Sequence, residues 1–283
     1  MLMAFLNRFK IYPLMKKGFL TNKYTLSVFI LLAILATDIL LHKGMSRVIL
    51  PENFTDKRSP QEAVKRCDQL LEIKGKRWMK AVNTPARARA LDSSINGIEM
   101  DVYFDTAANT FFVYHDSTGI STTTTEDIFL ILQESNIHFS VWLDFKNLNK
   151  KNQQASLEYL SSLKNRFRLD KKLLVESSDP SLLQLFCDSG YYTSYYVPFF
   201  NPYRENEEEL IQHIDTLTAL LDKYPVSALS GYYFQTPFLK KFFPAFPILT
   251  WTDDSRVSIV SRVFNRRLEK DPQVQIVLHN IDN

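Results

Sequence analysis

The chain contains the stretch GIEMDVYFD at residues 97–105, followed closely by FFVYHD at residues 111–116. Glu99 and Asp101 stand two residues apart in an apolar run, and side chains two apart on a strand point to the same face. Two carboxylates on one face repel each other unless a proton or a cation lies between them. The pattern therefore favours a divalent cation held by carboxylate oxygens, although a half-exposed strand with a polar face has the same pattern.

Short apolar runs alternate with helical patterns along most of the chain. We expect strands at residues 80–83, 97–105, 110–116, 140–147, 173–178, 192–197, 226–233, 246–252 and 274–278. We expect helices between them, at residues 85–91, 126–133, 153–167, 180–187, 207–221, 237–243 and 255–264. Strict alternation predicts a parallel sheet, and about eight units with a closing strand predict a (β/α)8 TIM-type barrel. A doubly wound sheet is the alternative, although no Gly-rich phosphate turn follows the first strand.

Polar side chains gather where the predicted strands end, which is where barrels of this type place their active sites. These residues are Asn83, Glu99, Asp101, His115, Asp144, Lys146, Glu176, Tyr196 and Trp251. Three of the acids, Glu99, Asp101 and Asp144, offer carboxylate oxygens to one Ca²⁺ or Mg²⁺ ion. His115 is placed to move a proton, and Lys146 can balance a developing negative charge.

The remaining strand-end residues are candidates for contacts with a substrate. We predict such contacts from Asn83, Glu176, Tyr196 and Trp251. Structural explanations compete with the functional ones, because Trp251 also suits ordinary core packing and Lys146 also suits a salt bridge to Asp144 or Glu176. The sequence leaves these alternatives open.

An apolar run lies near the N-terminus, at residues 24–42. Its length is close to the minimum for a membrane span, and a single acid, Asp38, lies near its far end. Residues 1–23 carry basic side chains and no acid, which predicts a cytoplasmic N-terminus, a single-pass transmembrane anchor and a periplasmic or extracellular barrel. A cleaved signal peptide is the alternative.

The rest of the chain divides into a linker at residues 43–75 and the barrel at residues 76–283, with a short amphipathic helix expected at 60–74. The net charge is only +3, and the basic N-terminal segment accounts for more than that. The barrel is therefore slightly acidic, and no nucleic-acid partner is expected. Cys67 and Cys187 show no metal-ligand spacing, so we interpret them as ordinary thiols, with a single disulfide as the alternative.

Several segments resemble the glycerophosphodiester phosphodiesterase-like group of the phospholipase-C-like phosphodiesterases, and most closely the menorin family. The segments are WMKAVN (78–83), GIEMDVYFD (97–105), VYHD (113–116), WLDFKNL (142–148), VESS (175–178) and LTWT (249–252). The resemblance covers nearly the whole predicted barrel. It implies a barrel that binds one divalent cation.

In this family a Glu-x-Asp pair and a later acid hold the metal, so the resemblance assigns that role to Glu99, Asp101 and Asp144. It also implies that His115 is one of two acid/base catalysts and that Lys146 helps to neutralise the phosphate. The implied function is a membrane-anchored, metal-dependent phosphodiester hydrolase. It would act outside the cytoplasm on a glycerophosphodiester or a lipid-headgroup-like substrate.

The resemblance breaks at Lys80, where the family has its second catalytic histidine. An ordinary lysine titrates about four pH units above histidine and is less suited to acid–base catalysis near neutrality. Lys80 is therefore a retuned acid, a cation that holds the phosphate, or the mark of a lost activity. The alternative function is a catalytically impaired barrel that binds a ligand or serves as a scaffold. Glycoside hydrolysis by Glu99 and Glu176 is a third option, but it leaves His115 and Lys146 without a role.

Overall fold

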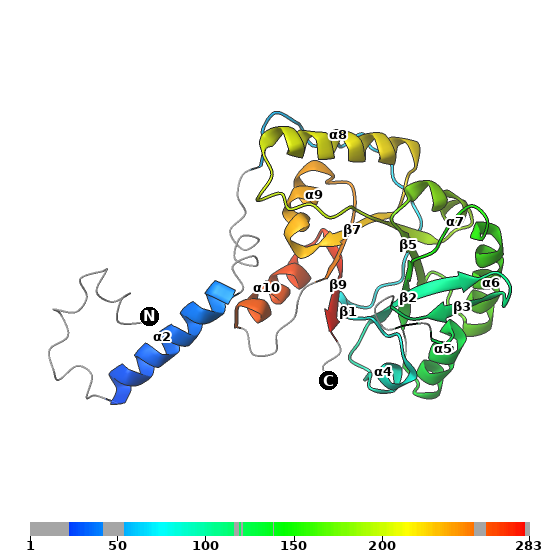
Figure 1. The fold of residues 1–283 in the computed structure, drawn as a ribbon, viewed down its shortest axis with the longest axis horizontal. Helices are drawn as coiled ribbons and strands as arrows, with labels where there is room; N and C mark the ends of the chain where they lie inside the picture. The colour runs from blue at the N-terminus through cyan, green and yellow to red at the C-terminus, as the bar shows by residue number, and fades with distance from the viewer. Residues whose placement is uncertain are drawn as a thin grey trace.

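The computed structural model describes residues 23–41, 54–115, 119, 121–137, 139–251 and 259–280. The described residues form a closed barrel of eight parallel strands surrounded by helices (Figure 1). The strands are β1 (Arg77–Lys80), β2 (Gly97–Asp105), β4 (Ser140–Phe145), β5 (Leu173–Ser177), β6 (Tyr192–Tyr196), β7 (Ala228–Tyr232), β8 (Ile248–Trp251) and β9 (Val274–Asn280). The barrel closes because β1 pairs in parallel with both β2 and β9. This confirms the TIM-type barrel and excludes the doubly wound sheet.

A hairpin extends the second strand of the barrel. β3 (Thr110–Val113) pairs antiparallel with the end of β2, and the turn between them passes through Asn109 in the left-handed region, at φ 48°. The chain then returns toward the barrel, where the amide of Tyr114 donates to the carbonyl oxygen of Asp101 at 3.2 Å. The hairpin therefore brings His115 to the edge of the barrel where the acids of β2 lie.

Helices cover the outside of the barrel (Figure 1). They are α4 (Pro85–Arg89), α5 (Thr125–Glu134), α6 (Gln153–Phe167), α7 (Gln184–Asp188), α8 (Glu207–Lys223), α9 (Thr236–Phe242) and α10 (Ile259–Lys270), with short 3₁₀ turns η3 (Pro180–Leu182) and η4 (Tyr233–Gln235). Thr84 and Asn206 cap the N-termini of α4 and α8, since both side chains accept hydrogen bonds from first-turn amides. The predicted start of the last helix at residue 255 lies outside the described residues.

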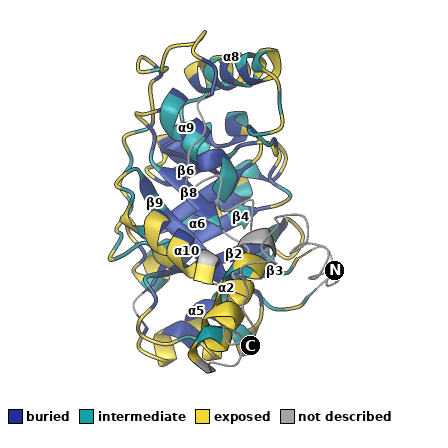
Figure 2. Ribbon diagram, turned by 90° about the vertical axis from the view of Figure 1, so that its left-hand side faces the viewer, coloured by how far each residue is buried: buried dark blue, intermediate teal, exposed yellow. Residues whose placement is uncertain are grey.

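A core of large apolar side chains fills the inside of the barrel, and most residues of the strands around it are buried (Figure 2). Seven strands contribute to this core through Trp78, Trp142, Leu174, Tyr192, Ala228, Leu249, Ile276 and Leu278. β2 begins with Gly97 instead, because a Cβ atom there would lie 2.3 Å from the indole of Trp78. A second, larger core lies between the strands and the helices.

Residues 54–76, here called the belt, cross the amino-terminal end of the barrel without forming a helix. The backbone amides of Gln61, Cys67 and Glu72 donate to carbonyl groups of the barrel at 2.6–3.0 Å. The helix predicted over 60–74 is therefore wrong, because its amides pair with other segments rather than with carbonyls four residues back. Leu71 and Ile73 of the belt pack against the core inside the barrel.

A disulfide joins Cys67 of the belt to Cys187 of α7, with the two Cα atoms 6.5 Å apart. The interpretation of the cysteines as ordinary thiols is therefore wrong, and the alternative of one disulfide is confirmed. The two residues are 120 positions apart in the sequence, so only the folded barrel brings them together.

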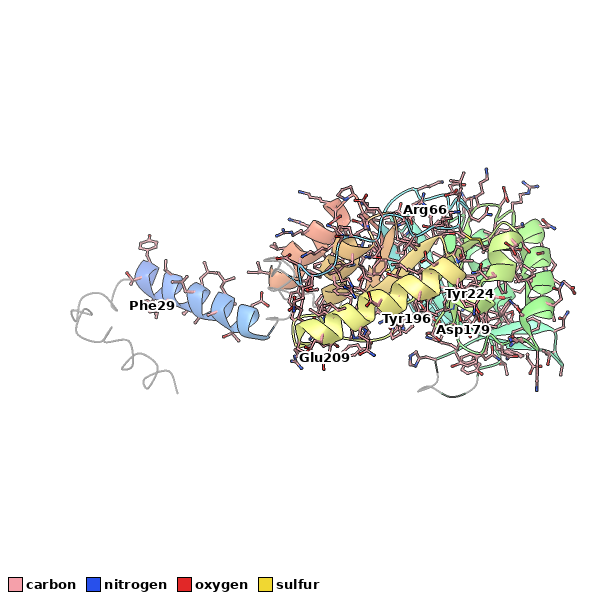
Figure 3. The ribbon with its side chains drawn as sticks, turned by 90° about the horizontal axis from the view of Figure 1, so that it is seen from above. Phe29, Arg66, Asp179, Tyr196, Glu209 and Tyr224 are labelled. Carbon is pink, nitrogen blue, oxygen red and sulfur yellow. A yellow bond between two sulfur atoms is a disulfide. The ribbon has the colours of Figure 1, made fainter. Side chains whose placement is uncertain are left out.

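The N-terminal helix α2 (Lys23–Leu41) lies outside the barrel and exposes apolar side chains, among them Phe29 (Figure 3). Within the part of the chain that the structure describes, no helix is long and apolar enough to cross a membrane. The transmembrane anchor predicted at residues 24–42 is thus not supported. Residues 1–22 and 42–53, which hold nearly all of the predicted cytoplasmic segment and the first part of the linker, lie outside the described residues.

Candidate active site

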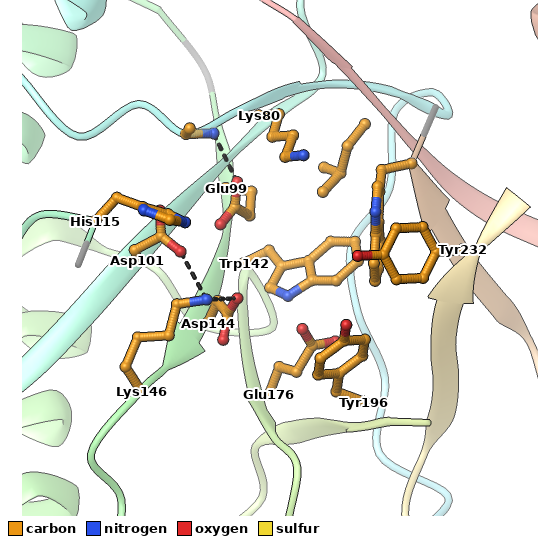
Figure 4. Close-up of a pocket in the computed structure, with 13 residues that line it drawn as sticks. Lys80, Glu99, Asp101, His115, Trp142, Asp144, Lys146, Glu176, Tyr196 and Tyr232 are labelled. Atoms are coloured by element: carbon orange, nitrogen blue, oxygen red, sulfur yellow. Dashed lines mark hydrogen bonds and ion pairs between the residues drawn. The ribbon is translucent and has the colours of Figure 1, made fainter. Parts of the chain in front are cut away.

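A cavity of about 220 Å³ opens at the carboxyl ends of the barrel strands (Figure 4). It is lined by Lys80, Ala81, Glu99, Asp101, His115, Trp142, Asp144, Lys146, Glu176, Tyr196, Tyr232, Trp251 and Leu278. Nine of the ten predicted site residues thus share one cavity, although they come from six strands and a hairpin. The tenth predicted residue, Asn83, does not line this cavity. The roles predicted for these residues are not tested by their placement.

Three acids form a compact cluster on one side of the cavity. One carboxylate oxygen from each of Glu99, Asp101 and Asp144 lies within 4.8 Å of the others. Glu99 and Asp101 point inward from β2 because they are two residues apart, and Asp144 is level with Asp101 on the neighbouring strand β4. The cluster is built from adjacent barrel strands, which hold the three groups in fixed positions.

The electrostatics of this cluster fit a divalent cation. Glu99 and Asp101 are each only 4% exposed, so their charges are poorly solvated. Burial, together with the charges of Asp101 and Asp144, raises the pKa of Glu99 to about 8, and burial raises the pKa of Asp144. The acids therefore repel one another without full compensation. Oxygen ligands at this spacing, with an excess of negative charge, match what Ca²⁺ and Mg²⁺ take in proteins.

Lys146 bridges two of the acids. Its Nζ atom lies 2.8 Å from Oδ1 of Asp101 and also contacts the carboxylate of Asp144. Burial lowers the pKa of Lys146, but the two neighbouring carboxylates outweigh burial and raise it above the ordinary value. The predicted alternative in which Lys146 forms a salt bridge to Asp144 is therefore confirmed. Because Lys146 also lines the cavity, its ammonium can still face a bound anion.

The loop after β1 orients the acids of β2. Ala81 adopts a left-handed backbone conformation at φ 54°, and its amide donates to Oε2 of Glu99 at 2.6 Å. The side chain of Asn83 donates to Oδ2 of Asp101 at 2.5 Å and accepts from the Asp101 amide at 3.0 Å. Asn83 does not line the cavity, so its position favours orienting Asp101 over the predicted contact with a substrate.

Lys80 and His115 face the cavity on either side of the Glu-x-Asp pair (Figure 4). Lys80 is the last residue of β1, and it occupies the place where the family resemblance expects a histidine. His115 is exposed at the rim, and its charge acts on Asp144. The cavity therefore combines an imidazole with the ammonium groups of Lys80 and Lys146 around the acidic cluster.

Aromatic side chains form the opposite wall of the cavity. Trp251 contacts Tyr196 and Tyr232, with ring centroids 5.5 and 4.9 Å apart. Burial and the charge of Asp144 raise the pKa of the nearby Glu176 well above its ordinary value. Trp142 was not among the predicted site residues. Trp142 could have been found from its spacing of two residues from Asp144, which puts both on one face of β4.

Solved structures with this arrangement of strands include phosphodiesterases. A protein assigned as a glycerophosphodiester phosphodiesterase from Galdieria sulphuraria matches with a TM-score of 0.51 and 12% identity, over 75% of this chain and 94% of that one. A phosphodiesterase from Oleispira antarctica, solved with its product sn-glycerol-3-phosphate, has a TM-score of 0.48 and 12% identity over 72% and 92%. A glycerophosphodiester phosphodiesterase from Parabacteroides distasonis matches with a TM-score of 0.47 and 14% identity, over 74% of this chain and 93% of that one.

At these identities the likeness extends to the fold alone, and of these three proteins the Galdieria one has a TM-score above 0.5. No protein-family model and no curated protein matches the chain, so the closer resemblance to menorins is not supported. The fold and the site together define a TIM-type barrel that is structurally similar to glycerophosphodiester phosphodiesterases. It carries a buried acidic cluster fit for a metal at the carboxyl ends of its strands.

Proposed function

We propose that this chain is a divalent-metal-dependent hydrolase of phosphodiesters, acting on a glycerophosphodiester or a lipid-headgroup-like substrate. One observation carries the proposal: three acids placed so that they could hold a cation share a cavity with two ammonium groups and an imidazole. Ammonium groups and a metal suit an anionic phosphate, and an imidazole suits proton transfer at neutral pH. The similarity of the barrel to a phosphodiesterase fold agrees with this reading.

Hydrolysis forms a bond between a water oxygen and phosphorus and breaks the bond to the leaving alkoxide, which must gain a proton. Glu99, Asp101 and Asp144 would hold one Ca²⁺ or Mg²⁺ ion, which when bound supplies a Lewis acid for a phosphoryl oxygen. Lys146 and Lys80 present positive charge to the phosphate from two sides. His115, exposed at the rim, exchanges a proton with the attacking or leaving oxygen.

The test is hydrolysis of glycerophosphodiesters and of a chromogenic phosphodiester by the purified chain with Ca²⁺, Mg²⁺ or Mn²⁺. We expect metal-dependent turnover, and a loss of about a hundredfold or more in Glu99→Gln because a ligand charge is removed. Glu158→Gln, an exposed acid on α6, is the matched control and should keep full activity. Equal turnover by Glu99→Gln and wild type, or none with any of the metals, would contradict the proposal.

Lys80 supports the second candidate, a barrel that binds its ligand without turning it over. Substitutions at Lys80 separate the two functions. If Lys80 holds the phosphate of a true substrate, Lys80→Ala lowers kcat/KM by about a hundredfold and Lys80→Arg retains part of it. If the chain binds without catalysis, wild type shows no turnover and Lys80→His creates it. Calorimetry also measures the binding of a phosphate ester to wild type and to each Lys80 variant.

We also propose that α2 attaches the barrel to a membrane and that the barrel lies outside the cytoplasm. Supporting the attachment, large apolar side chains are exposed along α2, namely Tyr24, Leu26, Val28, Phe29, Ile30, Leu31, Leu32 and Ile34. Supporting the compartment, the Cys67–Cys187 disulfide suits an oxidising environment.

Fractionation of cells that express the full chain tests the attachment, and protease accessibility tests the side of the membrane. We expect Leu31→Arg to shift the protein toward the soluble fraction, because a charge in an apolar helix opposes insertion. Asn165→Arg, which adds the same single charge at an exposed position on α6, should not shift it. An unchanged distribution of Leu31→Arg would count against the attachment.

A further inference from the structure

Helix α10 exposes apolar side chains on the face that points away from the barrel. Ile259 and Val263 are 46% and 51% exposed, and they lie on one face of the helix because they are four residues apart. The other face of α10 is buried, since Phe264 and Leu268 pack against β9. The exposed pair therefore contributes nothing to this core.

Basic side chains share the exposed face of α10. The helix contains four basic side chains and one acidic side chain, Glu269, whose Oε1 atom lies 3.1 Å from Nε2 of His279. Steps of three and four residues place a stripe of exposed side chains along the helix, made up of Ile259, Arg262, Val263, Arg266 and Lys270. The stripe combines aliphatic groups with positive charge. That combination suits the boundary between anionic lipid headgroups and acyl chains.

α10 also contacts α2, the helix that exposes a row of large apolar side chains (Figure 2). Single exposed apolar side chains are ordinary on a protein surface, whereas a large exposed apolar surface marks a site of interaction. The stripe of α10 therefore adjoins the segment that is proposed above to attach the barrel to a membrane.

A chain of aromatic contacts leads from α10 to the mouth of the cavity. Phe264 of α10 contacts Tyr233, and Tyr233 contacts Phe234, with ring centroids 5.2 Å apart in both pairs. Phe199 contacts Phe234 at 5.6 Å and also contacts Tyr232, which lines the cavity, at 5.1 Å. Phe199 is nevertheless 64% exposed. The mouth of the cavity therefore carries an exposed phenyl ring that packed rings join to α10.

We propose that Phe199 and the stripe of α10, together called the docking face, rest on an anionic lipid bilayer and hold the mouth of the cavity against its headgroups. This inference rests on the proposed function for the lipid-headgroup substrate that the mouth would meet. Phe199, Ile259 and Val263 would enter the boundary between headgroups and acyl chains, and Arg266 and Lys270 would lie among the phosphates. A bilayer fits this mixed surface without the close shape complementarity that a folded partner requires.

The first experiment places a fluorescent label on the docking face of the full chain. The chain has two cysteines, and both lie in the disulfide, so the label enters at an introduced cysteine. Val263→Cys carries the label on the stripe, and Glu158→Cys carries it on α6 as the control. The chain is mixed with phosphatidylcholine vesicles, with or without about 30% phosphatidylserine, that contain a lipid-bound quencher.

We expect the vesicles with phosphatidylserine to quench the label at Val263→Cys at least about twofold more than the neutral vesicles do, and to leave the label at Glu158→Cys bright. Equal quenching at the two positions, or by the two kinds of vesicle, would overturn the inference. So would an emission change that follows the protein concentration instead of the vesicles, because the face would then join two copies of the chain.

Charge reversal locates the contact on α10. With the label at Phe199→Cys, the double change Arg266→Glu, Lys270→Glu should lower the ratio of quenched to unquenched label at least about tenfold. Lys65→Glu, Lys74→Glu makes the same change of charge in the belt, at the other end of the barrel, and should keep the ratio. Circular dichroism and a melting curve establish that each variant is folded. An unchanged ratio in the α10 variant would overturn the inference.

Two comparisons separate this inference from the proposals about activity and attachment. Hydrolysis of a soluble glycerophosphodiester by wild type tests the activity without a bilayer. Turnover with an unquenched Val263→Cys label would overturn this inference alone, and a quenched label without turnover would overturn the proposed activity alone. If Leu31→Arg leaves the distribution in cells unchanged while anionic vesicles quench the label, the attachment by α2 fails and the docking face stands.

Discussion

Glu99 lies where burial, two neighbouring acids and one lysine act on the same carboxyl group. Burial and the charges of Asp101 and Asp144 raise its pKa to about 8, and the Ala81 amide and Lys146 only partly oppose them. Near neutral pH this carboxyl group therefore keeps a proton, which it would have to lose before it could bind a cation. A metal at this site competes directly with that proton.

Metal affinity should therefore depend on pH. We expect Mg²⁺ and Ca²⁺ to bind more tightly as the pH rises from 6 toward about 8, because ionisation of Glu99 no longer has to accompany binding. Calorimetry in buffers of different ionisation enthalpy measures both the affinity and the protons released. Binding that is independent of pH over this range, with no proton release, would contradict the raised pKa.

The same residue predicts how stability without metal depends on pH. The folded-state pKa of about 8 exceeds the ordinary value of 4.5, so the folded chain holds a proton that the unfolded chain has lost between these values. The free energy of unfolding should therefore fall as the pH rises through this window, and Glu99→Gln should flatten the decline. Urea melts of both variants in a chelator, from pH 5 to 9, provide the measurement.

At the scale of elements, the connection from β1 to α4 orients the two acids that β2 contributes to the site. It supplies the Ala81 amide to Glu99 and both hydrogen bonds of Asn83 to Asp101. Thr84 then caps α4 and Pro85 is its first residue, which fixes the point where the loop ends. Groups that orient metal ligands in this way contribute to affinity without touching the ion.

Asn83→Ala should weaken Ca²⁺ or Mg²⁺ binding by about 10- to 100-fold, because Asp101 loses the partner that fixes its carboxylate. Calorimetric titration at constant pH gives the change in affinity. Asn165→Ala, an exposed position on α6, is the control and should bind metal as wild type does. Wild-type affinity in Asn83→Ala would show that Asp101 is held by Lys146 and the strand alone.

At the scale of the whole molecule, the two ends of the barrel are built differently. The carboxyl end is open and carries the cavity, whereas the belt closes the amino end through Leu71, Ile73 and the Cys67–Cys187 disulfide. Crosslinking residues 120 positions apart restricts the unfolded chain strongly. The contacts that close the amino end are therefore separate from the candidate site at the carboxyl end, as is usual for this fold.

Loss of the disulfide should lower stability and leave the site unaffected. We expect the Cys67→Ser, Cys187→Ser double variant to lose about 2–4 kcal/mol in free energy of unfolding. Urea denaturation measures this loss, and calorimetry should show unchanged metal affinity. A reductant should destabilise wild type in the same direction but have no effect on the double variant. Equal stability of the oxidised and double-variant proteins would mean that the belt is held by its other contacts.

The periodicity of the sequence determined most of the barrel and much of its site. Glu99 and Asp101 are two residues apart, which places both side chains on one face of their strand. The alternation of strands and helices placed Asp144, Glu176 and Trp251 at the same end of a parallel sheet. These are local properties, because the direction of a side chain follows from its own strand. The structure confirms that they share a cavity.

Only the tertiary structure decided what joins segments that are distant in the sequence. The belt has a helical pattern, yet its amides pair with the barrel, and its cysteine finds a partner 120 residues away. The hydrogen bonds between Asn83 and Asp101 likewise depend on the closure between β1 and β2. The physical reason is the same in each case: a side chain's direction is local, whereas its partner depends on how the barrel closes.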